Sequence, residues 1–195
     1  MIRAEGLDLK GEPPGIRLTE SRQVIQKKTI IRMKPKKNLI RNSILKNKKQ
    51  SRVRGDIVAV PLGDGRTAFA LVLKRPLFAF FDLCLTGVPS MQEIAAAPIA
   101  FKILVVEYAV AKGIWPVIGH VEIENIDESP QFFKRDPITK LLFTTYTGEE
   151  EESATLDECI GLECAAVWAP HHVVDRLNDH FAGRPNKWVQ SLKAR

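Results

Sequence analysis

The sequence predicts a mainly β (α+β) domain, built as a small bent antiparallel sheet or an SH3-like half-open barrel with short helices and a C-terminal helix. Two observations lead to this prediction. Residues 55–168 hold several short β-rich segments separated by turn residues. An amphipathic segment follows at residues 171–182, with Val173 and Leu177 on its apolar face. Short strands with few helices, in about 140 residues, are typical of a small sheet or barrel that packs a helix on one side.

The first strand and the turn after it are the clearest local signal. Residues 56–62 are β-rich, and Gly63-Asp64-Gly65 can supply the positive φ angles that a tight hairpin needs. Residues 67–74 then return as a second strand, so the sheet is antiparallel at its start. Further strands are expected at residues 77–85, 99–107, 114–119, 141–146 and 164–168. Pro116 favours an edge position for the strand that contains it.

Capping signals place the helices. Ser90 with Glu93, and Thr155 with Glu158, have the spacing of a capping box, in which each Ser or Thr begins a short helix. Gly183 ends the amphipathic helix, because glycine suits the position after a helix C-terminus. Residues 122–137 and 149–152 are predicted to be polar loops.

The net charge of +6 combines two halves of opposite sign. Residues 1–54 hold sixteen Lys/Arg and four Asp/Glu, a net charge of +12, and residues 55–195 hold thirteen and nineteen, a net charge of −6. Since the first aromatic residue is Phe69, residues 1–54 cannot anchor much of a core, and we expect a basic, disordered N-terminal extension before a single β-rich domain at residues 55–195. Such an extension is the one feature that would bind nucleic acid, through counterion release. The alternative is an extension without function, with Met33 as an internal start.

Cysteine usage and hydropathy indicate the compartment. Three cysteines, Cys84, Cys159 and Cys164, are an odd number without a repeated spacing, which argues against a disulfide scaffold. No apolar run reaches the ~18 residues of a membrane span, and no apolar signal core opens the chain. We expect a cytoplasmic protein with no membrane partner.

The C-terminal helix carries the strongest candidate for catalysis. His171, His172, Asp175 and Asp179 are spaced so that imidazole and carboxylate groups share a helix face. They could hold a divalent metal, such as zinc, with positions left open for water. In an enzyme, the catalytic residues would be His171, His172, Asp175 and His180. The alternative is an ordinary solvated helix face. Elsewhere there is no nucleophile elbow, Walker loop or dinucleotide fingerprint.

Two smaller candidates are single residues near predicted strand ends. His120 follows Gly119, and Asp56 follows Gly55 and could reach the same region. Asp56 is expected to cap a turn.

Acidic loops are the competing candidate for function. Together with two aromatic anchors they would form an acidic surface that attracts a basic protein. The predicted members of this surface are Glu122, Glu124, Glu128, Glu149, Glu150, Glu151, Phe133 and Tyr146. The alternative is a set of ordinary solvated loops.

Several motifs resemble the immunity protein 26 family of bacterial polymorphic toxin systems. The main one is the segment Gly55-Asp56-Ile57-Val58-Ala59-Val60-Pro61-Leu62-Gly63-Asp64-Gly65-Arg66, followed by Phe69 and Val72-Leu73. Similar segments are Trp115-Pro116-Val117-Ile118-Gly119, Phe133-Lys134-Arg135-Asp136-Pro137, Asp175-Arg176-Leu177 and His180-Phe181. The likeness extends from residue 55 to about residue 192 and leaves out the basic extension.

The resemblance implies a mainly β domain that binds and neutralises a toxin, without a cofactor. A toxin that cuts nucleic acid is usually basic, and the charge of −6 has the sign that would mask it. The same family label is attached to the phosphotriesterase HocA, so the resemblance also implies an alternative, an organophosphate hydrolase that uses a metal-activated water. The chain is too short for the large (β/α) barrel of better-known phosphotriesterases. We favour the binding protein over the enzyme, and both over a nucleic-acid-binding module.

Overall fold

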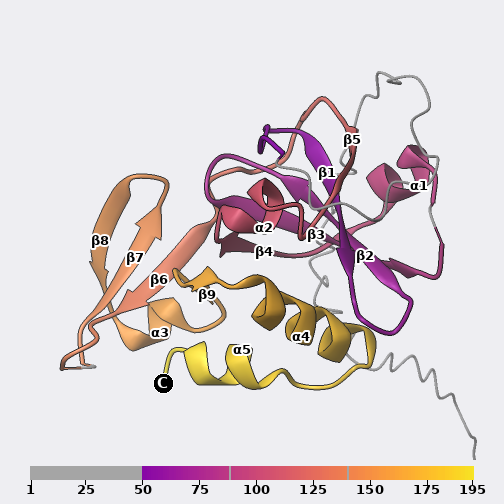
Figure 1. Ribbon diagram of the computed structural model, residues 1–195. Coiled ribbons are helices and arrows are strands. Elements are labelled where there is room, and N and C mark those ends of the chain that lie inside the picture. The colour runs from indigo at the N-terminus through magenta and orange to yellow at the C-terminus, as the bar shows by residue number, and fades with distance from the viewer. Residues whose placement is uncertain (1–49, 88, 140) are drawn as a thin grey trace, which may run out of the picture.

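The computed structural model describes residues 50–87, 89–139 and 141–195 and contains two mixed β-sheets (Figure 1). In the order β10-β4-β3-β2-β1-β5, the six-stranded sheet contains Val167–Trp168, Ile99–Val105, Leu77–Leu85, Thr67–Val72, Asp56–Pro61 and Val117–His120. In the order β8-β7-β6-β9, the four-stranded sheet contains Glu150–Ala154, Phe143–Thr147, Gln131–Arg135 and Glu163–Cys164. Neighbouring strands are antiparallel except for the parallel pairs β10–β4 and β6–β9. The mainly β prediction is confirmed, and neither sheet closes into a barrel.

The hairpin between β1 and β2 forms where the sequence predicts it. Val60 pairs with Ala68, and Gly63 and Gly65 have φ angles of 88° and 87°. Such angles are accessible to glycine without steric cost. Pro116 directly precedes β5, an edge strand of the six-stranded sheet, which confirms the edge expected from the proline.

Both predicted capping boxes are present. The side chains of Ser90 and Thr155 each accept a hydrogen bond from the backbone of the glutamate three residues on, and each glutamate bonds back. The described helices are α1 (Met91–Ala96), α2 (Tyr108–Ala111), α3 (Leu156–Cys159), α4 (Pro170–Phe181) and α5 (Lys187–Leu192). The sequence predicts α1, α3 and α4. It does not indicate α2 and α5, which have only four and six residues.

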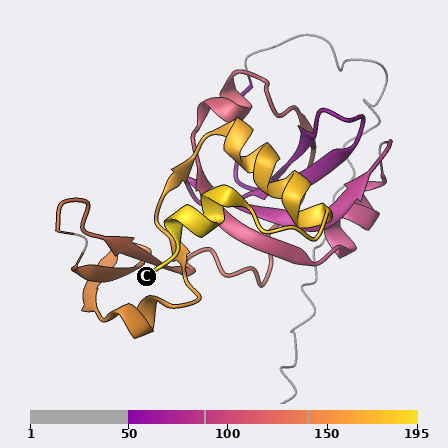
Figure 2. The same cartoon turned by 90° about the horizontal axis from the view of Figure 1, so that it is seen from below.

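Both faces of the six-stranded sheet are buried. On one face Val173 and Leu177 of α4 pack in a cluster with Phe80 and Trp115, and Figure 2 shows α4 and α5 lying across the sheet. On the other face, Ile94 of α1 and Phe132 of β6 belong to a second cluster. Burial on both faces explains why its central strands are almost continuously apolar. Phe132 also attaches the four-stranded sheet to the larger one.

Arg176 links the two sheets from α4. Its side chain is buried, its guanidinium lies 3.9 Å from the ring centroid of Phe101 in β4, and it forms an ion pair with Glu163 in β9. The two nitrogens of a guanidinium can bind both oxygens of a carboxylate, which fixes geometry as well as charge. α4 is thereby attached to both sheets at once.

Three predicted segments differ from the structure. The expected loop at residues 122–137 contains β6, and the expected loop at residues 149–152 is mostly β8. The single strand expected at residues 164–168 is two short strands, β9 and β10, in different sheets. The charged residues of β8 show no alternation of apolar and polar positions that would predict a strand. β8 is an exposed edge strand and therefore needs no apolar face.

Predictions for the basic extension lie almost entirely outside the described residues, and its boundary with the domain stays a prediction. Within the described part of the chain, no helix has the length and apolarity needed to cross a membrane.

Candidate functional site

The histidines expected at a metal site pack with one another and with α5. The ring of His172 lies 3.9 Å, between centroids, from the ring of Trp188, and 4.0 Å from that of His171. Partial burial, with the neighbouring His171, lowers the pKa of His172 below its ordinary value. This arrangement favours the neutral imidazole and holds α4 against α5.

The carboxylates of the same helix have other partners. Asp175 accepts a hydrogen bond of 3.0 Å from the indole nitrogen of Trp188. Asp179 accepts bonds of 2.9 Å from Arg184 and from Asn186. Both therefore fasten the segment after α4 to that helix.

No metal-holding group forms from the predicted residues. His180 faces Asp82 of β3, with 2.9 Å between Nε2 and Oδ1. Among the described residues, no three or more His, Cys, Asp or Glu side chains are grouped so that they could hold a metal ion. The predicted catalytic and metal set of α4 is thus better explained by packing, and its role in catalysis stays an untested prediction.

Asp56 and His120 do meet. The Oδ2 atom of Asp56 accepts a 3.0 Å hydrogen bond from the Val53 backbone, so the residue caps a turn as expected. Its Oδ1 atom lies 2.9 Å from Nδ1 of His120. The pair joins the beginning of β1 to the end of β5, next to the backbone contact between Gly55 and Val121. This geometry stabilises the sheet edge.

The strongest concentration of acidic groups lies on the β7–β8 hairpin. Glu149 stands in its two-residue turn, and Glu150, Glu151 and Glu152 are consecutive exposed residues of β8. Glu151 pairs with Lys134 of β6, which also lies over the ring of Tyr146 at 4.6 Å. We call Glu150–Ala154 with Glu149 the acidic strand. Because it is an edge strand, it presents its charges to any protein that approaches this side of the sheet (Figure 1).

A half-open cleft connects the acidic strand with the β5–β6 connection. Its walls are Lys74, Arg75, Pro76, Leu77, Leu104, Glu128, Ser129, Pro130, Phe132, Tyr146, Gly148 and Glu149. Glu128 forms an ion pair of 2.8 Å with Arg54. Of the residues predicted for the acidic surface, Glu128 and Glu149 therefore lie in one cleft, whereas Glu122 and Glu124 do not line it.

One predicted aromatic anchor is wrong. Phe133 is 1% exposed and packs with Phe143 and Cys159 beneath the four-stranded sheet, so it cannot reach a partner. Successive side chains of a strand point to opposite faces, so Phe132 and Phe133 lie on different faces of β6, and each face is covered. Tyr146 is half-buried and lines the cleft.

Sequence reasoning missed the most exposed apolar group among the described residues. Ile138, Leu141 and Leu142, in the loop between β6 and β7, are 88%, 80% and 66% exposed. We call these three residues the aliphatic tip. The sequence places these apolar residues shortly after Asp136-Pro137, but the strand predicted at residues 141–146 includes Leu141 and Leu142, whereas β7 begins only at Phe143.

Residues 53–140 match the family model described as immunity protein 26. The match supports the resemblance seen in the motifs of that region, and it includes β1 to β6. The acidic strand and α4 lie beyond its end. No curated protein and no solved structure matches the chain. Nothing in these comparisons supports the phosphotriesterase alternative.

Proposed function

We propose that this protein is an immunity protein, which binds a bacterial toxin and neutralises it. The match of residues 53–140 to the immunity protein 26 model is the observation that carries this conclusion. The family implies a toxin partner in general. The proposed role is binding alone and requires no cofactor, and its place would be the cytoplasm, where a toxin that cuts nucleic acid acts.

The partner that best fits this surface is a cationic, nuclease-like toxin domain. The support is the acidic strand, with Glu149, Glu150 and Glu152 exposed at a sheet edge, and the net charge of −6 over residues 55–195. A surface of one sign steers a partner of the opposite sign and speeds association at low salt. A nuclease domain needs basic groups to bind the phosphates of nucleic acid. An acidic protein surface that covers the domain competes with those phosphates for the same basic groups.

A binding and protection experiment tests the proposal. The probes are purified, catalytically inactivated toxin domains of net positive charge from the strain that carries this chain. We expect one of them to bind, with an association rate that falls as salt rises, and we expect co-expression of this protein to protect cells from the active form. If no toxin domain binds and none is neutralised, the proposed function is wrong.

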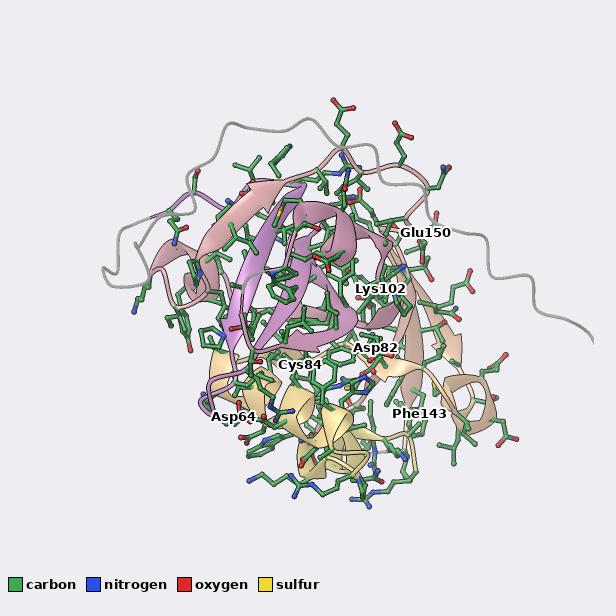
Figure 3. All side chains as sticks on the ribbon, turned by 90° about the vertical axis from the view of Figure 1, so that its right-hand side faces the viewer. Asp64, Asp82, Cys84, Lys102, Phe143 and Glu150 are labelled. Carbon is green, nitrogen blue, oxygen red and sulfur yellow. The ribbon has the colours of Figure 1, made fainter. Side chains whose placement is uncertain are left out.

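Charge reversal identifies the surface. Glu150→Lys should slow association several-fold at low salt and flatten its salt dependence, because the variant reverses one steering charge. Asp64→Lys, in the turn between β1 and β2, makes the same change of charge away from the acidic strand (Figure 3) and is the matched control. Equal association rates for the two variants and the wild type would exclude the acidic strand as the steering surface.

A further inference from the structure

The aliphatic tip is unusual because a folded protein has no internal reason to expose it. Single exposed aliphatic residues are ordinary, but here three from one short loop are 66–88% exposed. Exposed apolar groups that gather at one place are typical of surfaces that bind another protein.

Hydrogen bonds order the described residues of the loop that carries the tip. Oδ1 of Asp136 accepts hydrogen bonds from the backbone nitrogens of Ile138 and Thr139, at 3.1 and 2.6 Å, and from the Thr139 hydroxyl at 2.8 Å. The backbone nitrogen of Asp136 donates to the carbonyl of Leu142 across the loop, at 2.9 Å. A loop ordered before binding loses less conformational entropy when it docks.

The tip lies at the end of the four-stranded sheet that is opposite the acidic turn. Phe143 pairs with Ala154, and Glu150 pairs with Thr147 at the other end of the same hairpin. Figure 3 places Phe143 and Glu150 at these two ends. Two further exposed apolar residues follow β8: Leu156, the first residue of α3, and Ile160, directly after that helix. Five residues of strand separate the ends, roughly 17 Å, so one partner of standard interface size would cover both.

We propose that the aliphatic tip is the apolar anchor of the toxin-binding surface and enters an apolar depression beside the basic patch of the toxin domain. The inference rests on the proposed function. Charge complementarity selects this occupant, because a partner that covers the tip also meets the carboxylates of the acidic strand. A second copy of this chain would bring acidic strands of the same sign together.

Dissociation kinetics distinguish an anchor from a steering charge. The probe is the toxin domain that binds in the binding and protection experiment. Ile138→Ser/Leu141→Ser should raise the dissociation rate at least ~10-fold while the association rate and its salt dependence stay unchanged, since buried apolar anchors act mainly on dissociation. Ile138→Ser alone should give a smaller effect of the same kind. Ile114→Ser, which alters a 41% exposed aliphatic residue before Trp115, is the matched control and should have no effect.

The outcomes separate the two proposals. If the wild type binds a toxin and the tip variants dissociate at the control's rate, the anchor is wrong and the proposed function stands. If no toxin domain binds the wild type, both are wrong. If light scattering shows a wild-type dimer that the tip variants convert to a monomer, the tip serves self-association and the anchor is wrong. An unchanged melting temperature shows that the variants are folded.

Discussion

At the residue scale, the role of a side chain depends on which group it meets. Asp175 and Asp179 have the spacing of metal ligands, yet they bind Trp188, Arg184 and Asn186. Hydrogen-bond donors supplied by the segment after α4 satisfy these carboxylates, and no spacing within α4 could have indicated that.

Gly55 offers a sharp test at this scale. Its φ angle is 93°, and an added Cβ atom would collide with the backbone carbonyl of Val121, which cannot move without disturbing the end of β5. Gly63 has a similar φ of 88° with open space around it. We expect Gly63→Ala to cost about 1–2 kcal/mol of unfolding free energy from the backbone angle alone, and Gly55→Ala about 3 kcal/mol or more, because the collision is added. Urea unfolding of the two variants measures the difference. Equal losses would show that Val121 gives way and that the collision has no cost.

At the element scale, the short helices α1 and α3 depend on their capping boxes. Hydrogen bonds from Ser90 lower the pKa of Glu93, and hydrogen bonds from Thr155 lower the pKa of Glu158, each below the ordinary value of 4.5. Helices of six and four residues cannot form alone, so these bonds and the packing of Ile94 and Cys159 hold them in place.

These pKa shifts predict a dependence of stability on pH. Because the folded pKa of each glutamate is lowered, its stabilising contribution is fully present above about pH 4.5 and is lost as the pH falls through the folded value. In the double variant Glu93→Gln/Glu158→Gln, the side chains at these two capping positions have no carboxyl group to titrate. We therefore expect its melting temperature to fall less steeply than that of the wild type between about pH 6 and pH 3. Calorimetric scans across this range provide the measurement, and parallel curves for the two proteins would contradict the assignment.

At the scale of the whole molecule, the described chain is already attached to the core before β1. Nη2 of Arg52 donates hydrogen bonds of 3.0 Å to the carbonyls of Leu73 and Leu77, and its guanidinium lies 4.8 Å from the ring centroid of Phe78. Gln50 accepts a bond of 2.8 Å from the backbone of Val117. The folded unit thus uses residues that composition assigns to the basic extension.

Two truncations locate the functional boundary of the domain. A chain that begins at Gln50 should keep the melting temperature of the full chain within a few degrees, because residues 1–49 lack aromatic side chains and carry dense positive charge. A chain that begins at Gly55 should melt at least ~5 °C lower, since it leaves a buried carbonyl without its donor. Thermal unfolding of both truncated chains measures the difference. A large loss on removing residues 1–49 would show that they stabilise the fold, and equal stability of the two truncations would contradict the role of Arg52.

The sequence by itself determined the mainly β class, the β1–β2 hairpin, both capping boxes and α4, because turn glycines, cap spacings and a strong helical periodicity act over a few residues. Motifs in residues 55–140 also pointed to the family whose model matches there. Only the tertiary structure decided that residues 131–135 and 150–154 are strands and that Phe133 is buried. It also decided that Asp175 accepts a hydrogen bond from Trp188 of α5, that Asp179 accepts one from Asn186 at the N-cap of α5, and that the aliphatic tip is exposed. Each of these depends on a partner distant in sequence: a neighbouring strand supplies the hydrogen bonds of an edge strand, and packing across the sheet decides which face is covered.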